Sequence, residues 1–123
     1  MARDGRQALG ISGENLACAE LQRRGYAILE RRYRTRLGEI DIIARDGPTL
    51  VFVEVKARLT DDFGGAAAAV TAWKQRRVAH MAMDYLSRRT QVDCPCRFDV
   101  VAIDVDADGP RIIVYPSAFD SPF

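Results

Sequence analysis

The sequence predicts a single α/β domain, in which a mixed central sheet of about five strands is flanked by helices in the order α-β-β-β-α-β-β. Short runs rich in β-branched and aromatic residues alternate with turn residues. Two longer segments have helical composition, one before the first strand and one after the third. A length of 123 residues, 48% of them hydrophobic, suits one globular domain. We expect this domain to span residues 1–123, with loose tails at 1–11 and 117–123.

The first helix is expected from Ser12 to about Arg24. Ser12 is a suitable N-cap, and Gly25 follows as a residue that readily ends a helix. Glu14 then lies in the first turn, where an acidic side chain interacts favourably with the helix dipole.

The first strand is expected over residues 26–30 and leads into the arginine-rich run 31–36. Because side chains alternate along a strand, Arg32, Arg34 and Arg36 would share one side. This side is either a solvated face or an edge that contacts phosphates.

The next two strands, residues 39–44 and 50–56, are predicted to form an antiparallel hairpin. The connection Asp46-Gly47-Pro48-Thr49 has the composition of a tight turn. Two further strands, residues 97–105 and 111–115, are expected near the end of the chain.

Charged residues interrupt the otherwise apolar hairpin strands. If the turn is centred in the middle of its connection, Asp41 lies opposite Glu54, and Glu39 lies opposite Lys56. Directly opposed carboxylates repel each other, and a divalent cation that prefers oxygen ligands, Mg²⁺ or Mn²⁺, would offset this repulsion. The inference depends on register, because a shift of one residue would place Asp41 and Glu54 on opposite faces.

The second helix is expected over residues 66–89, with a break near 70–71. Lys74 and Arg77 are three residues apart and therefore lie on one helical face, which gives a basic strip. Trp73 could stack on a nucleobase, but we expect it to pack in the core or at an interface.

The overall composition limits the function. No apolar run approaches the ~20 residues of a membrane span, and the polar N-terminus has no signal-peptide core, so we expect a cytoplasmic protein without a membrane partner. The three cysteines are expected to be reduced thiols. His80 is the only histidine, which argues against a Ser-His-Asp mechanism, and we expect it to be a helix-surface or partly buried residue. The net charge is only +1, but clustered arginines can still bind phosphates locally.

Asp41, Glu54 and Lys56 form the set that carries chemistry. A metal held by two carboxylates would polarise a phosphate oxygen and lower the pKa of a bound water. Lys56 could orient or deprotonate this water, or neutralise charge in the transition state, and Glu39 could support the set as a neighbouring carboxylate. The sequence contains no P-loop and no G-x-G-x-x-G motif. Phosphodiester hydrolysis is therefore favoured over acyl transfer and redox chemistry.

The segments Gly38-Glu39-Ile40-Asp41 and Val51-Phe52-Val53-Glu54-Val55-Lys56 together resemble the D-(x)n-(D/E)-x-K motif of the PD-(D/E)XK nuclease superfamily. The chain is most similar to the YraN family of small bacterial proteins, which is related to archaeal Holliday junction resolvases. In place of the proline that usually precedes the first aspartate, this chain has Ile40, a common departure. The similarity runs from about Gly13 to Val105 and includes Gly13-Glu14, Gly25-Tyr26, Ala69-Val70, Lys74, Arg77 and Arg97-Phe98-Asp99-Val100-Val101.

The resemblance implies a restriction-endonuclease-like core that binds Mg²⁺ or Mn²⁺. Glu14 would join Asp41 and Glu54 as the acidic catalytic and metal-binding set, with Lys56 as the catalytic lysine. The implied activity is a metal-dependent endonuclease acting on DNA, including branched recombination intermediates, and the relatives raise the hypothesis of a homodimer. The residues expected to contact nucleic acid are Arg34, Arg36, Arg58, Lys74 and Arg77.

An alternative is a nucleic-acid-binding or partner-binding module on a nuclease-like fold, with little or no catalysis. The net charge of only +1 favours it, whereas the opposed carboxylates argue against it. A purely structural domain is the third interpretation.

Overall fold

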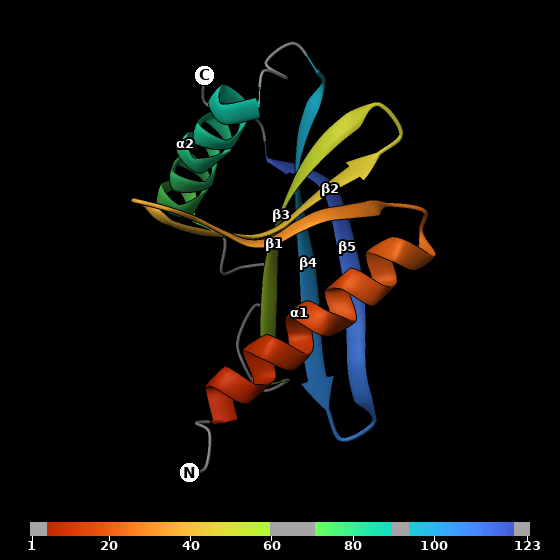
Figure 1. Cartoon of the computed structure of the whole chain (residues 1–123). Helices are drawn as coiled ribbons and strands as arrows, with labels where there is room; N and C mark the ends of the chain where they lie inside the picture. Colours follow the sequence, from red (N-terminus) through yellow and green to blue (C-terminus); the bar gives the residue numbers. More distant parts are fainter. Residues whose placement is uncertain (1–4, 60–70, 90–93, 120–123) are drawn as a thin grey trace.

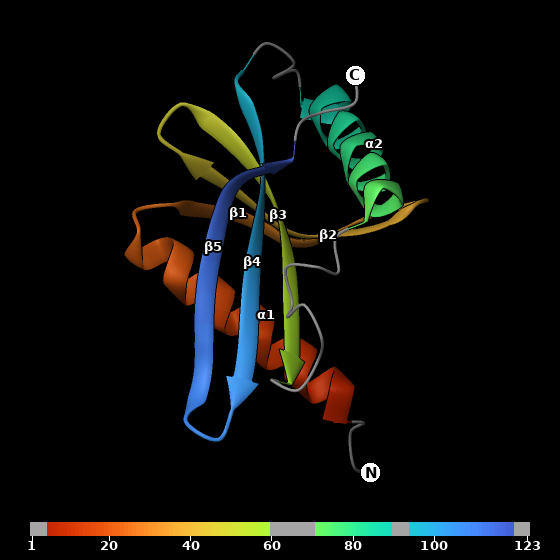
Figure 2. The ribbon, with the colours of Figure 1, turned by 180° about the vertical axis from the view of Figure 1, so that it is seen from behind.

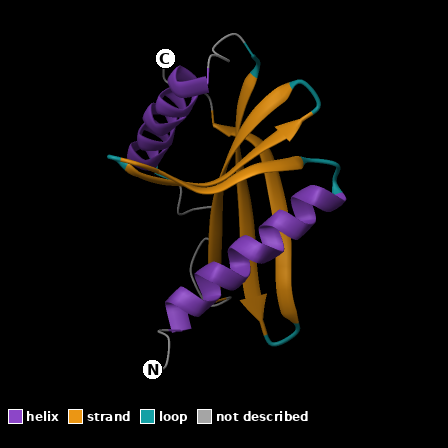
Figure 3. Ribbon diagram, viewed as in Figure 1, coloured by secondary structure: helices purple, strands orange, loops and turns teal. Residues whose placement is uncertain are grey.

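The protein forms one five-stranded sheet with a helix on each face, and a computed structural model describes residues 5–59, 71–89 and 94–119. The strand order is β1-β2-β3-β4-β5, in which β3 and β4 are parallel and all other neighbours are antiparallel. The mixed sheet and the order α-β-β-β-α-β-β are as predicted (Figure 3). The elements are α1 (Gly5–Arg23), β1 (Ala27–Thr35), β2 (Gly38–Asp46), β3 (Thr49–Leu59), α2 (Ala72–Arg89), β4 (Cys96–Asp106) and β5 (Gly109–Phe119).

Two hydrophobic clusters fill the two faces of the sheet. Helix α1 crosses one face, where Ala17 and Leu21 pack against Val51 and Val53 of β3 (Figure 1). Helix α2 covers the other face, where Met81 and other α2 residues pack around Phe52 and Phe98, and Figure 2 shows this helix from behind. Because side chains alternate along β3, Glu54 and Lys56 lie on the same face as Phe52, the α2 face.

The β1–β2 hairpin bends away from β3 in the middle of the sheet. Strand β2 pairs with β3 from Ile42 to Asp46, but it pairs with β1 as far as Gly38. The segment from Gly38 to Asp41 therefore belongs to the hairpin alone. Figure 1 shows this hairpin curving toward α2 while β3 continues in its original direction. We call the point where Asp41 leaves β3 the strand fork.

Helix α1 begins at Gly5, so the expectation of a loose tail was wrong for residues 5–11, as was that of an N-cap at Ser12, while residues 1–4 lie outside the described part of the chain. The helix passes through Gly13 because this position lies against β3. A Cβ atom built on Gly13 would stand 2.9 Å from the Cβ of Ala57. Tertiary packing thus overrides the low helix propensity of glycine. The predicted stop is confirmed, since Gly25 has φ +93° and the N–H of Tyr26 bonds to the carbonyl of Leu21.

Strand β5 extends to Phe119, so residues 117–119 are not the loose tail that the sequence predicted. Two contacts explain the extension. The Phe119 ring stacks on Phe98 with centroids 5.0 Å apart, and the N–H of Ser117 donates to the Asp99 carboxylate at 3.0 Å. Residues 120–123 lie outside the described part of the chain.

Helix α2 begins after Thr71, near the break expected at 70–71. The Thr71 hydroxyl accepts the backbone N–H of Lys74 at 3.2 Å, which makes Thr71 the N-cap. Residues 66–70, expected in the same helix, lie outside the described residues. The cap fixes the start of the helix, and therefore the position of Lys74 beside the sheet.

Two expectations concern the chain as a whole. None of the helices in the described residues has the length and apolar content to cross a bilayer. The thiols of Cys18, Cys94 and Cys96 are free, and only Cys18 is buried.

Candidate functional site

Asp41 lies at the strand fork beside Glu54. The register of β2 against β3 is the predicted one from Asp46 as far as Ile42, which faces Val53. Asp41 lies just beyond this last pair, close enough to Glu54 for their charges to interact. Oδ2 of Asp41 accepts the backbone N–H of Val55 at 2.7 Å. Burial and the Glu54 charge raise the pKa of Asp41 to about 7, despite the hydrogen bond from Val55. The fork therefore holds two acidic groups, and the negative charge of Glu54 disfavours ionisation of Asp41.

Two lysines adjoin this pair. Nζ of Lys56 lies 3.3 Å from Oε1 of Glu54, a carboxylate that is itself buried. Burial lowers the pKa of Lys56, but the hydrogen bond to Lys74 and the charge of Glu54 outweigh it and raise the pKa overall. The pKa of Lys74 is lowered in turn by this hydrogen bond and by burial. Lys56 is therefore the more firmly protonated of the two amines.

Glu14 approaches the site from α1 but pairs with arginines of β1. Its Oε1 lies 3.1 Å from Nε of Arg32 and 3.2 Å from a terminal nitrogen of Arg31. Arg32 adopts φ +54°, an unusual backbone conformation for a residue with a side chain. The Glu14 charge still contributes to the raised pKa of Asp41, as the smallest of its causes. Glu14 therefore lies near the carboxylate pair, with its own charge compensated by two cations.

Glu39 does not face Lys56, so this predicted pair was wrong. The hairpin has already left β3 at Glu39, which lies opposite Arg34 of β1 instead. Oε1 of Glu39 is 3.6 Å from Nε of Arg34, and both side chains are solvent-exposed. Counting residue pairs outward from the turn failed here, because β2 no longer pairs with β3 beyond Ile42.

The positions of these carboxylates show which of them could bind a metal ion. Among the described residues, no group of three or more His, Cys, Asp or Glu side chains is arranged to hold a metal ion. The predicted three-carboxylate set is therefore not assembled, because Glu14 binds its arginines. Asp41 and Glu54 remain as an opposed pair of oxygen donors. This pair suits Mg²⁺, which in proteins commonly takes one or two carboxylates and completes its shell with water and substrate phosphates.

A basic hollow lies between the hairpin tip and α2. The hairpin contributes Arg34 and Arg36, two of the residues expected to contact nucleic acid, and α2 contributes Arg88. Asp84 is the acidic residue of this hollow. The hydrogen bond from Tyr33 is the main cause of its lowered pKa. Three arginines against one aspartate give the hollow a net positive charge.

The other predicted contacts lie at the start of α2 or outside the described side chains. Lys74 lies beside Lys56, and Arg77 lies next to the hairpin, where its Cζ would be 3.9 Å from a Cβ built on Gly38. The side chain of Arg58 falls outside the described residues. Trp73 is 59% exposed, so it does not pack in the core, and packing at an interface stays a prediction.

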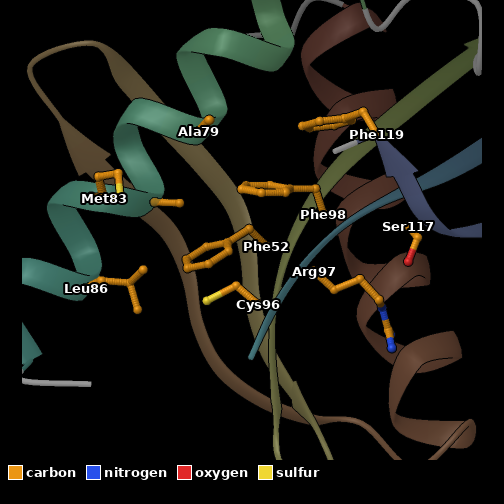
Figure 4. A pocket seen from close by; sticks show the side chains of 10 residues that line it. Phe52, Ala79, Met83, Leu86, Cys96, Arg97, Phe98, Ser117 and Phe119 are labelled. Atoms are coloured by element: carbon orange, nitrogen blue, oxygen red, sulfur yellow. The ribbon is translucent and has the colours of Figure 1, made fainter. Parts of the chain in front are cut away.

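A second hollow, on the α2 face, is predominantly apolar. Phe52, Phe98 and Phe119 line it beneath Met83 and Leu86 of α2 (Figure 4). None of the carboxylates at the strand fork lines it. Its lining offers few groups for phosphate chemistry, so the fork is the better candidate site.

The sequence reasoning missed several polar residues around the fork. Arg31 and Arg32 were seen only as members of a basic run, and nothing in their spacing indicated that they would bind Glu14. Arg88 is more than fifty residues from Arg34 in sequence, so no local pattern could place the two in one hollow.

Comparison with known proteins gives a consistent family match. The model of "Uncharacterised protein family UPF0102" matches residues 13–103. A UPF0102 protein of Geobacter metallireducens is 46% identical over 114 residues, which cover 93% of each chain. A UPF0102 protein of Ralstonia pickettii is 52% identical over 116 residues, covering 91% of this chain and 90% of the relative. One of Chlorobium chlorochromatii is 54% identical over 99 residues, covering 80% and 76%.

Proposed function

We propose that this chain, which belongs to the UPF0102 family, is a metal-dependent nuclease that hydrolyses phosphodiester bonds in DNA. The family membership confirms the similarity to YraN proteins stated from the sequence. The observation that carries the proposal is the opposition of Asp41 and Glu54 at the strand fork, with Lys56 paired to Glu54.

Asp41 and Glu54 would hold a Mg²⁺ or Mn²⁺ ion, which when bound supplies Lewis acidity and a more acidic water. The raised pKa of Asp41 supports this assignment, because the site is short of positive charge at neutral pH. A hard divalent cation supplies this charge and favours the ionised form of both acids.

Lys56 is best suited to neutralise charge. Its pKa is raised and its ammonium lies against Glu54, so it is a poor base but a well-placed cation beside a scissile phosphate. Of the roles open from the sequence, charge stabilisation therefore fits better than deprotonation of water. Lys74 of α2 is hydrogen-bonded to Lys56 and has a lowered pKa, so it supports the protonated form of Lys56.

The basic hollow provides a place for the substrate backbone. Arg34, Arg36 and Arg88 project from two different elements that meet beside the hairpin tip. Arginines bind phosphate oxygens through charge-assisted hydrogen bonds and position a strand without reading its sequence. A DNA strand in this hollow would run along the same hairpin that carries Asp41.

Cleavage assays test the proposal directly. Linear duplex, single-stranded, flapped and four-way DNA are incubated with Mn²⁺ or Mg²⁺. We expect cleavage of at least one substrate, and Asp41→Asn, Glu54→Gln and Lys56→Ala should each lower its rate about 100-fold or more. Glu20→Gln is the matched control, because Glu20 lies on α1 and pairs with its helix neighbours Arg23 and Arg24.

Calorimetric titration of Mn²⁺ gives a measurement that does not depend on turnover. Binding to the unaltered protein should be lost in Glu54→Gln and kept in Glu20→Gln. Metal-dependent cleavage that survives all three site substitutions would disprove the proposal, provided that contaminating nucleases are excluded.

The second candidate function is a nucleic-acid-binding module with little or no catalysis. The pairing of Glu14 with Arg31 and Arg32 favours it, because this pairing withholds a third carboxylate from the fork. Salt-dependent binding without metal dependence or cleavage would support this function instead.

A further inference from the structure

Trp73, the only tryptophan of the chain, lies in the first turn of α2 with 59% of its surface exposed. A ring of this size is normally buried, because removing its apolar surface from water is strongly favourable. The backbone at this turn is capped, because the Thr71 hydroxyl accepts the N–H of Lys74.

The position of this ring is supported by an arginine. Cζ of Arg77 lies 4.6 Å from the centroid of the Trp73 ring, a cation–π contact. Arg77 is itself held next to Gly38 of the hairpin. Within the described residues, Nε of Arg77 is buried without a hydrogen-bond acceptor. The ring thus has a cation over it, while 59% of the residue's surface stays exposed.

The surroundings of the ring are cationic and continuous with the candidate site. Lys74, the next residue, is hydrogen-bonded to Lys56, which pairs with Glu54. Arg76 is exposed on the same turn of the helix. This charge favours a polyanion over an apolar protein surface as the ligand of the ring. An exposed aromatic ring among cations is the arrangement with which proteins bind single-stranded nucleic acid.

We propose that Trp73 is a stacking platform for an unpaired nucleobase of a nucleic acid strand that enters the strand fork. The proposal rests on the proposed function for the identity of the ligand as nucleic acid, and it specifies the substrate class. A base inside a continuous duplex is stacked on both faces and cannot reach the ring. The preferred ligands therefore contain unpaired nucleotides, as single strands, flaps and open junctions do.

The single tryptophan makes the test direct, because tryptophan fluorescence reports on Trp73 alone. The full chain is titrated in EDTA with an oligothymidylate of about 15 nucleotides, a length within the range of single-strand sites, and with a blunt duplex of equal length. We expect the single strand to quench Trp73 emission and the duplex to leave it unchanged.

Anisotropy of labelled DNA measures the affinity of the variants. Trp73→Ala should weaken single-strand binding about 5- to 150-fold, the range that corresponds to loss of one stacked base, and leave duplex binding unchanged. Trp73→Phe keeps an aromatic face and should retain most of the affinity. Met83→Ala is the matched control, since Met83 is 48% exposed on the same helix but lies at the apolar hollow.

Several results would overturn the inference. These are equal quenching by duplex and single strand, unchanged single-strand affinity in Trp73→Ala, or an emission change that follows protein concentration alone, which would assign the ring to a second copy of the chain. Quenching by single strands without cleavage in Mn²⁺ would leave the platform standing and contradict the nuclease proposal. Cleavage in Mn²⁺ together with unchanged single-strand affinity in Trp73→Ala would support the nuclease proposal and contradict the platform.

Discussion

Two carboxylates of the sheet, the buried Asp99 on β4 and the partly buried Asp41 on β2, have opposite surroundings. Asp99 is fully buried and accepts hydrogen bonds from Tyr26, from the backbone N–H of Ser117 and from Arg97, whose Nε is 2.9 Å away. Asp41 accepts the backbone N–H of Val55 and lies near the charge of a second carboxylate, Glu54.

The difference separates a structural carboxylate from one that is available to a ligand. A buried charge is tolerated when a cation and hydrogen bonds replace its hydration, as Arg97 and its neighbours do for Asp99. At Asp41 burial and Glu54 disfavour the ionised form, so its pKa is raised to about 7. We infer that Asp99 stabilises the fold, whereas Asp41 costs stability until a cation binds.

The largest predicted effect is at Asp99. Asp99→Asn removes the buried one of the two carboxylates that pair with Arg97 and should lower the free energy of unfolding by about 3–5 kcal/mol, the usual cost of breaking a buried ion pair. Urea denaturation measures this loss. Asp106→Asn is the control and should change stability by less than about 1 kcal/mol, because Asp106 pairs with exposed Arg111. A loss below 1 kcal/mol at Asp99 would break the comparison.

Asp41→Asn should have the opposite sign. The asparagine keeps an oxygen for the Val55 N–H and removes the unfavourable charge. We expect the variant to be more stable than the unaltered protein at pH 8 in EDTA by up to about 4 kcal/mol, since each unit of pKa difference corresponds to about 1.4 kcal/mol.

The pH dependence of this gain follows from the direction of the pKa change. The pKa of Asp41 is about 7 in the folded chain and near 3.8 when unperturbed. Below pH 4 the group is protonated in both states, and the two proteins should differ little. As pH rises from 4 to 7 only the unfolded chain loses the proton, so the unaltered protein loses stability relative to the variant. A gain that does not depend on pH would contradict this account.

The sequence indicated the surroundings of Asp41 but not those of Asp99. The turn at Gly47-Pro48 sets the register locally, and this register is confirmed as far as Ile42 and Val53, next to Asp41 and Glu54. The turn could not reveal where the sheet divides, so Glu39 was placed wrongly. The Asp99 network joins β4 to Tyr26, 73 positions earlier in sequence, and no local pattern indicates such a contact.

The third prediction concerns how α1 brings Glu14 to the fork. Gly13→Ala would place a Cβ 2.9 Å from that of Ala57 and force α1 away from β3. We expect a loss of about 1–3 kcal/mol in the free energy of unfolding, as for other overpacked positions. In an Ala57→Gly background the opposing atom is gone, so the same substitution should cost much less. Equal costs in both backgrounds would show that the close approach does not matter.

The smallest predicted effect distinguishes a two-carboxylate fork from a three-carboxylate one. Both Glu54 and Glu14 raise the pKa of Asp41 through their charges, but Glu54 is the stronger cause. Glu54→Gln should therefore lower the pKa of Asp41 clearly. Glu14→Gln should lower it only slightly, because Arg31 and Arg32 already offset the Glu14 charge.

Titration of the Asp41 carboxyl carbon by NMR in EDTA measures both changes in the folded protein. Arg32→Gln supplies the complementary test, since loss of a cation next to Glu14 should raise the pKa of Asp41. If Glu14→Gln lowered that pKa as much as Glu54→Gln does, Glu14 would have to act as a full member of the acidic site. The arginine pairing would then be a weak restraint that a metal ion could displace, and the fork would hold three ligands instead of two.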